Sequence, residues 1–247
     1  MLEALAQRLH DHAVDDAVGD LLASHTEVVG VMGGHSLHRD DPVYRTVAEL
    51  GRALAREGLL VSTGGGPGAM EAANLGAWLA GQPDAALDEA LRALAAENAY
   101  RNADTYLDVA LGVRERFGPE QAATSLAVPT WFYGHEPTNV FATHVAKYFA
   151  NSIREDGLLA IANRGVVFAP GSAGTTQEIF QDATQNYYRV FGHLSPMVLL
   201  GTGHWNDHLP AAPLLEALAA SAKEPWGQMI TVTDDTAEAV RAVLRTD

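Results

Sequence analysis

Short runs of consecutive apolar residues alternate along the chain with longer stretches in which apolar residues recur every three or four positions. The short runs are typical of strands buried on both faces of a parallel sheet, and the longer stretches are typical of amphipathic helices. The predicted strands span residues 27–32, 59–63, 127–132, 165–169, 196–200 and 229–232. The predicted helices span residues 2–23, 42–57, 137–162, 176–188, 211–220 and 236–244, and one more follows a glycine turn at 64–68 and ends near residue 80.

The order of these elements predicts an α/β fold. Strands separated by helices of about ten residues or more need crossover connections, which are right-handed and produce an open parallel sheet with helices on both faces. Residues 81–126 interrupt this alternation with an Ala-rich, acidic and helical pattern, so we expect a helical insertion at the periphery. Because 247 residues lie within the range of one α/β domain, we predict a single Rossmann-like domain over residues 1–247.

The charge of the chain restricts its partners. Acidic residues outnumber basic residues 31 to 16, and no tract rich in lysine and arginine occurs, so no nucleic-acid partner is expected. A small anionic ligand would instead be held by backbone N–H groups at helix N-termini and by one or two basic side chains. The sequence contains neither an apolar run of about 18 residues that could span a membrane nor a secretion signal. We therefore expect a cytoplasmic protein without a membrane partner.

The first candidate site is a glycine turn, Gly-Gly-Gly-Pro-Gly at residues 64–68, between a predicted strand and a predicted helix. Free N–H groups converge at such a turn, and glycine lets an anion approach the backbone closely. A tight connection without a ligand is an equally good interpretation of this turn alone. The turn also matches the dinucleotide fingerprint G-x-G-x-x-A, but the acids about 20 positions later, Asp84 and Asp88, fall in the insertion rather than at a strand end. We therefore do not expect a nicotinamide cofactor.

The second candidate site is the sequence Pro-Gly-Ser-Ala-Gly-Thr-Thr-Gln-Glu at residues 170–178, again between a strand and a helix. The hydroxyl groups of Ser172, Thr175 and Thr176 can supplement backbone donors around a phosphate. No lysine precedes the threonines, which excludes a Walker A loop and hydrolysis of a polyphosphate. The turn therefore favours a nucleoside 5′-monophosphate as its ligand.

Glu178, at the end of this sequence, has two interpretations. Thr175-x-x-Glu178 is a capping box, in which the glutamate bonds back to the N–H of the N-cap residue and stabilises the helix by about 1 kcal/mol. Alternatively, a carboxylate that faces the ribose C1′ atom would stabilise the positive charge that develops when a glycosidic bond is cleaved. The spacing is compatible with both interpretations.

Together, these residues resemble the Lonely guy (LOG) family, whose proteins are often mislabelled lysine decarboxylases. The family hallmark P-G-G-x-G-T-x-x-E corresponds to residues 170–178. The version Gly-Pro-Gly-Ala-Met-Glu-Ala at 66–72, followed by Glu-Pro-Thr-Asn at 136–139, is closer to the long bacterial nucleotide 5′-monophosphate nucleosidases than to the short plant-hormone enzymes. The resemblance covers residues 28–188 and implies hydrolysis of a nucleoside monophosphate to free base and ribose 5-phosphate.

The resemblance also implies roles for individual residues. The essential glutamate corresponds to Glu178, and the essential arginine of the preceding helix corresponds to Arg154, for which an exposed ion pair with a neighbouring acid is the alternative. Ser172 replaces the second glycine of the hallmark and either narrows the pocket or supplies a hydroxyl ligand, and the His-x-Arg-Lys signature of the short enzymes is missing. We expect Glu178 to stabilise the developing cation or to orient water. The expected nucleotide contacts are Gly33, Gly34, Ser36, Gly65, Gly66, Met70, Glu136, Asn139, Gly171, Ser172, Ala173, Gly174, Thr175 and Thr176.

Other functions compete with hydrolysis. Relatives of this fold carry the molybdenum cofactor, so a protein that binds or carries its ligand on the same turn is the main alternative. Lysine decarboxylation is less favoured, because Lys147 and Lys223 are the only lysines that could form a Schiff base with pyridoxal phosphate.

No metal or other cofactor is expected. Cysteine is absent, and the histidines lack the H-E-x-x-H pattern, with the best local group in a segment at 204–208 that reads equally well as a polar loop. The family leads us to expect a homodimer or a higher homo-oligomer. Tyr187, Tyr188 and Phe191 are candidates for its interface, although aromatic residues at helical spacing are more often part of a core.

Overall fold

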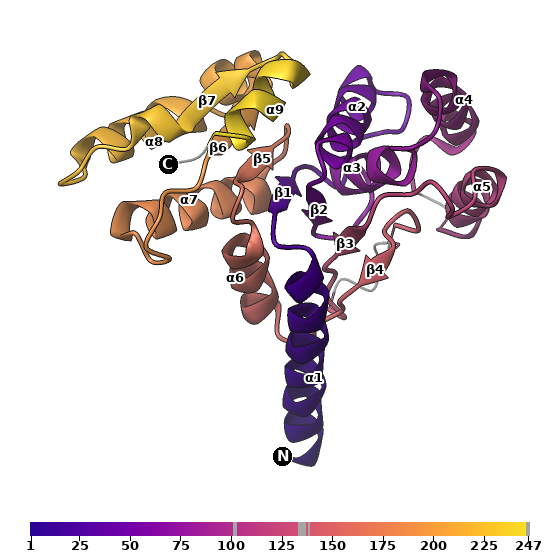
Figure 1. Ribbon diagram of the computed structural model, residues 1–247, viewed down its shortest axis with the longest axis horizontal. Helices are drawn as coiled ribbons and strands as arrows, with labels where there is room; N and C mark the ends of the chain where they lie inside the picture. Colours follow the sequence, from indigo (N-terminus) through magenta and orange to yellow (C-terminus); the bar gives the residue numbers. More distant parts are fainter. Residues whose placement is uncertain (101–102, 133–136, 138, 246–247) are drawn as a thin grey trace.

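The computed structural model describes residues 1–247 except for 101–102, 133–136, 138 and 246–247. Its strands are Val28–Met32 (β1), Leu60–Thr63 (β2), Ser125–Ala127 (β3), His144–Val145 (β4), Val166–Phe168 (β5), Met197–Leu200 (β6) and Ile230–Thr233 (β7). They form one sheet with the order β4-β3-β2-β1-β5-β6-β7, in which all neighbours run parallel (Figure 1). The predicted parallel sheet is therefore confirmed.

Helices cover both faces of this sheet, as the alternation of elements predicts (Figure 1). The helices are Leu2–Ser24 (α1), Pro42–Arg56 (α2), Ala69–Trp78 (α3), Asp84–Leu94 (α4), Ala103–Arg116 (α5), Asn151–Ile161 (α6), Ala173–Tyr188 (α7), Ala211–Ser221 (α8) and Thr236–Val243 (α9). One buried apolar cluster joins α2, α3 and α9 with α4 and α5, and a second joins α6, α7 and α8. None of the described helices is both long enough and apolar enough to cross a membrane.

Strand β1 lies at the centre of the sheet, between β2 and β5. The chain leaves β1 towards β2 and returns later to β5, so the loops that follow β1 and β5 diverge at the carboxyl edge of the sheet. Such a topological switch point is where ligands bind in open α/β sheets. The two glycine turns follow β2 and β5, so the fold brings both of them to this edge, on either side of the loop after β1.

One strand boundary differs from its prediction. The strand predicted at 127–132 begins at Ser125 and ends at Ala127, so the helical pattern predicted for 81–126 ends before β3. Pro129 lacks the N–H that a continued ladder would need. Beyond it, one isolated parallel bridge joins Thr130 to the segment after β4.

The first half of the helix predicted at 137–162 is wrong. The helix begins only at Asn151, because residues 144–145 form the edge strand β4. Thr143 fastens this strand to β3, since its hydroxyl donates to the Ser125 carbonyl at 2.9 Å and accepts from the Ser125 N–H at 2.8 Å. The other predicted strands and helices lie within a few residues of their predicted ends.

A buried ion pair joins the loop after β1 to the first turn of α3. Arg39 donates to the two carboxylate oxygens of Glu71 at 2.9 and 2.6 Å, and the hydroxyls of Tyr44 and Tyr106 donate to the same carboxylate. Arg39 also donates to the main-chain carbonyls of Glu97 and Tyr106, which ties the segment that contains α4 and α5 to the loop after β1. The glutamate of the sequence Gly-Pro-Gly-Ala-Met-Glu is therefore a structural anchor.

Replacing Glu71 with glutamine is expected to lower the free energy of unfolding by about 3–5 kcal/mol, because the buried Arg39 guanidinium loses its counter-charge. Urea denaturation followed by circular dichroism measures this change. The control is Glu49→Gln, which removes an exposed partner of Arg45 and should cost at most about 1 kcal/mol. Small and equal effects of both substitutions would contradict the anchoring role of Glu71.

Candidate functional site

The main chain of Gly34, in the loop after β1, joins the two glycine turns. Its N–H donates to the carbonyl of Pro170 at 3.0 Å, and its carbonyl accepts from the N–H of Ala69 at 3.1 Å. A side chain on Gly68 would collide with the Gly34 carbonyl, and one on Gly171 would lie 3.1 Å from the Gly34 nitrogen. Gly68 also has a φ of +71°, which favours glycine. Glycines in both turns therefore allow the three loops to meet.

A cavity of about 260 Å³ lies where these loops meet, beyond the carboxyl ends of β1, β2 and β5. Main-chain atoms of the two turns form part of its wall, and side chains from α6 and α7 form another part. The predicted residues that line it are Gly33, Gly34, Gly65, Gly66, Met70, Arg154, Ser172, Gly174, Thr175 and Glu178.

Arg154 is a buried cation in the wall of this cavity rather than part of an exposed ion pair. Its side chain is 8% exposed, and Nη1 lies 3.8 Å from Glu155 Oε1. Nε donates to the Val128 carbonyl at 2.7 Å and Nη2 donates to the Gly64 carbonyl at 3.2 Å. A side chain on Gly64 would collide with the guanidinium. The main-chain carbonyls that follow β2 and β3 therefore fix Arg154 in place.

Glu178 lines the same cavity from α7. This helix has Ser172 as its N-cap, so Thr175 lies inside the helix and the capping box is not formed. Burial raises the pKa of Glu178 to about 7, with Arg154 acting against the shift and Glu155 adding to it. A carboxyl group with this pKa can release or accept a proton at neutral pH.

The N-terminus of α7 reaches the cavity without a side-chain cap. Its first N–H groups have no partner within the helix and lie at the positive end of the helix dipole, which suits an anion. Ser172, Gly174 and Thr175 line the cavity at this point. The Thr176 hydroxyl instead donates to the Ser172 carbonyl at 2.9 Å, so Thr176, like Ala173, belongs to the helix start but not to the cavity lining.

Asn139 supports the first glycine turn from outside the cavity. Its N–H donates to the Gly65 carbonyl at 3.0 Å, and Nδ2 donates to the Gly66 carbonyl at 3.3 Å and to Asn74 Oδ1 at 3.1 Å. This buried residue is placed to shape the turn. Glu136, the other residue predicted to contact sugar or base, lies outside the described residues.

A second hollow of about 370 Å³ adjoins the cavity at Gly34 and Ser172. The predicted contacts Ser36 and Gly171 line this hollow and not the main cavity. His204 lines it too, with Nε2 3.0 Å from the Gly171 carbonyl oxygen, and burial lowers the pKa of the imidazole. The segment at 204–208 forms a π-helical turn, and the His204 side chain holds this turn against the second glycine turn.

Lys147 adds a second cation to the cavity and was not predicted as a site residue. It follows β4, and its Nζ atom lies 4.2 Å from the centre of the Trp131 ring. An anion site in so acidic a chain requires one or two basic side chains, and Arg154 and Lys147 supply them. The scarcity of lysine was an available signal, but only the pairing of β4 with β3 brings Lys147 to this edge. Other unpredicted residues of the lining are Met32, His35, Gly64, Pro129, Thr130, Pro137 and Glu155.

Comparisons with known proteins agree with this fold. Residues 26–82 match the SLOG cluster4 family (LDcluster4), a family of LOG type, so the predicted resemblance is confirmed. No curated sequence matches the chain. The segment that matches the family, residues 26–82, includes β1, β2 and the first glycine turn.

Solved structures share the fold over most of the chain. The molybdenum cofactor binding protein of Rippkaea orientalis is 14% identical over 88% of this chain and 94% of its own, with a TM-score of 0.56. TM1055 is 22% identical over 88% of this chain and 98% of its own, with a TM-score of 0.55. The molybdenum cofactor carrier protein of Chlamydomonas reinhardtii is 20% identical over 88% and 95%, with a TM-score of 0.52. These likenesses confirm the Rossmann-like α/β fold.

The Glu178 carboxyl is expected to titrate near pH 7, which ¹³C NMR of labelled protein measures directly. Arg154→Met should raise the midpoint further, because a nearby positive charge favours the ionised carboxylate. The control is Arg45→Met, which removes an exposed cation on α2 and should leave the midpoint unchanged. A midpoint near 4.5, or one that Arg154→Met does not move, would contradict the described environment of Glu178.

Proposed function

We propose that this LOG-type chain is a nucleoside 5′-monophosphate phosphoribohydrolase, which cleaves the N-glycosidic bond to give free base and ribose 5-phosphate. The observation that carries the proposal is that Glu178, whose pKa burial raises to about 7, lines one cavity with the buried Arg154 and the two glycine turns. We also propose that residues 1–247 act as one nucleotide-binding domain with residues 81–126 as its helical insertion, and that the protein works in the cytoplasm.

The phosphate is proposed to bind at the N-terminus of α7. The free N–H groups of the helix and the Ser172 hydroxyl would surround it, and the glycines of the first turn would allow its close approach. Arg154 and Lys147 would supply positive charge against a net charge of −15. This placement leaves the ribose between the two turns, with C1′ towards Glu178.

Glu178 is proposed to act first as a base and then as an acid. The oxygen of a water molecule forms a bond to C1′ while the C1′–N bond breaks, and the water proton passes to the carboxylate. The electron pair of the broken bond stays on the base nitrogen, which then takes the proton from Glu178. The ionised carboxylate stabilises the oxocarbenium-like transition state, and a pKa of about 7 permits both proton transfers at neutral pH.

A protein that binds or carries its ligand unchanged is the second candidate. The molybdenum cofactor binding and carrier proteins have similar folds over 88% of the chain. The hollow at Ser36 and His204 adds about 370 Å³ beside the main cavity, which is room for a ligand larger than a nucleoside monophosphate. Such a ligand would place its phosphate on the same turn.

Hydrolysis is tested by incubating the purified protein with AMP, GMP, CMP and UMP and measuring free base by liquid chromatography. We expect release from at least one nucleotide, and a loss of about 10²- to 10⁴-fold in kcat for Glu178→Gln, which cannot exchange the proton. The control is Thr184→Ala, on the exposed side of the same helix. Folded protein that releases no base from any nucleotide would overturn the hydrolase, and a ligand that copurifies intact would support the carrier.

We further propose a homodimer or higher homo-oligomer that uses the C-terminal end of α7. Tyr188, Val190 and Phe191 are 72, 59 and 46% exposed, and Tyr187 packs edge to face against Tyr188. Light scattering should give at least twice the mass of one chain, and the double substitution Tyr188→Ser, Phe191→Ser should reduce it. Leu111→Ser, which changes an exposed apolar residue of α5, is the control. A single-chain mass for the unaltered protein would contradict the proposal.

A further inference from the structure

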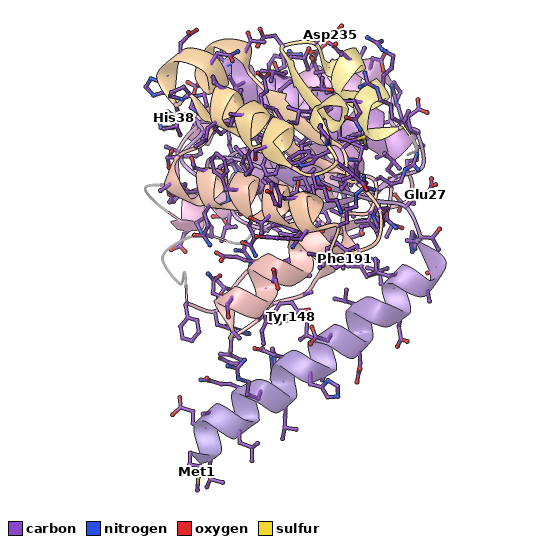
Figure 2. All side chains as sticks on the ribbon, turned by 90° about the vertical axis from the view of Figure 1, so that its left-hand side faces the viewer. Met1, Glu27, His38, Tyr148, Phe191 and Asp235 are labelled. Atoms are coloured by element: carbon purple, nitrogen blue, oxygen red, sulfur yellow. The ribbon has the colours of Figure 1, made fainter. Side chains whose placement is uncertain are left out.

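Helix α1 carries one buried side chain, and that side chain is charged. The first turns of α1 project away from the sheet, and Figure 2 shows the helix running past Tyr148 to Met1. Leu5 and Leu9 on these turns are 57 and 62% exposed, whereas Asp11 is 2% exposed. A buried carboxylate on a helix whose other residues are exposed or half-buried requires partners that offset the loss of water.

The partners of Asp11 are main-chain N–H groups at the start of α6. Phe149 donates to Oδ1 at 2.9 Å and Ala150, the N-cap residue of α6, donates to Oδ2 at 2.8 Å. Ala150 has no capping side chain of its own, and the Asp11 carboxylate, on another helix, pairs the N–H of this N-cap residue and of the residue before it. Burial acts to raise the pKa of Asp11, but these hydrogen bonds and the neighbouring His10 outweigh it and lower the pKa.

Apolar packing between α1 and α6 is incomplete. A hollow of about 200 Å³ lies between the two helices, lined by apolar residues such as Val18 and Ile153, and it extends to Arg154. The half-buried Val14, Val18, Leu21 and Leu22 of α1 pack against the second apolar cluster, and polar tethers add to this packing in aligning α1 with α6. Asp15 forms the second tether, because its carboxylate accepts from the Tyr148 hydroxyl at 2.9 Å.

The segment that Asp11 and Asp15 hold, residues 147–154, contains both cations of the candidate site, Lys147 and Arg154. The N–H of Arg154 donates to the Ala150 carbonyl at 3.1 Å, in the first turn of α6, so the position of this turn sets the position of the Arg154 main chain. Lys147 directly precedes Tyr148, whose N–H donates to the carbonyl of Pro129 in the cavity wall at 3.0 Å. A shift of the start of α6 would therefore move Arg154 away from the carbonyls that hold it.

We infer that Asp11 is a positioning residue of the site: by holding the start of α6 from α1, it keeps Arg154 in its place beside Glu178. The catalytic consequence rests on the proposed function, but the effects on the Glu178 carboxyl and on phosphate binding do not require hydrolysis. Among the residues that the structure describes, the charged and titratable groups that line the cavity with Glu178 are Arg154 and Glu155 of α6, Lys147 and His35.

The test compares Asp11→Ala and Asp11→Asn with Asp16→Ala, which removes an exposed carboxylate from the same helix. Three properties are measured on the full chain: the Glu178 titration by ¹³C NMR, the affinity for ribose 5-phosphate by calorimetry, and thermal stability. We expect Asp11→Ala to raise the Glu178 midpoint above about 7 and to weaken binding of ribose 5-phosphate about tenfold. Asp11→Asn, which keeps one acceptor oxygen, should have a smaller effect, and Asp16→Ala should have none.

The outcomes separate this inference from the proposed function. A loss of stability in both Asp11 variants without any change in the Glu178 midpoint or in binding would mean that Asp11 only holds α1 in place, and would overturn the inference. If the protein hydrolyses nucleotides, the KM of Asp11→Asn should rise more than its kcat falls. If it hydrolyses none, the proposed function fails, while a shifted Glu178 midpoint still supports the inference. Should Asp11→Ala not fold, the same measurements on Asp11→Asn decide.

Discussion

The candidate site depends on the main chain of one residue, Gly34. Its N–H and carbonyl are hydrogen-bonded to the loop after β5 and to the start of α3, so the loop after β1 is fastened on both sides. A side chain on Gly68 would collide with the Gly34 carbonyl, and one on Gly171 would collide with the Thr175 side chain. Two glycine motifs far apart in the sequence therefore pack against the same residue, Gly34. The crevice at the carboxyl edge of the sheet takes its shape from this packing.

The two residues of the candidate pair are held in different ways. Arg154 donates hydrogen bonds to the main-chain carbonyls that follow two strands. It therefore stabilises the fold in addition to offering a positive charge to a ligand. Glu178 lies on α7, where burial raises the pKa of its carboxyl to about 7. One group is fixed and permanently charged, and the other can change its charge. This difference matches the roles of a ligand holder and a proton carrier.

The sequence predicts the centre of this fold better than its edge. Each central strand is a buried apolar run that ends at glycine or proline, and few other structures fit such a run. The two residues of β4 are exposed, and the strand depends on hydrogen bonds between Thr143 and Ser125 that no local pattern contains. Glu178 and Arg154 were found through a family resemblance, whereas Lys147 was missed because its place depends on that edge strand.

The two cations of the cavity lie in a protein with a net charge of −15. The net negative charge of the protein therefore repels an anionic ligand at a distance, and the two cations attract it only once it enters the cavity. Salt screens exposed charges beyond about 8 Å at physiological ionic strength but screens buried charges much less. Added salt would weaken the repulsion more than the attraction. The association rate of such a ligand should then rise with ionic strength, the reverse of the behaviour of proteins that draw in their ligands by opposite charge.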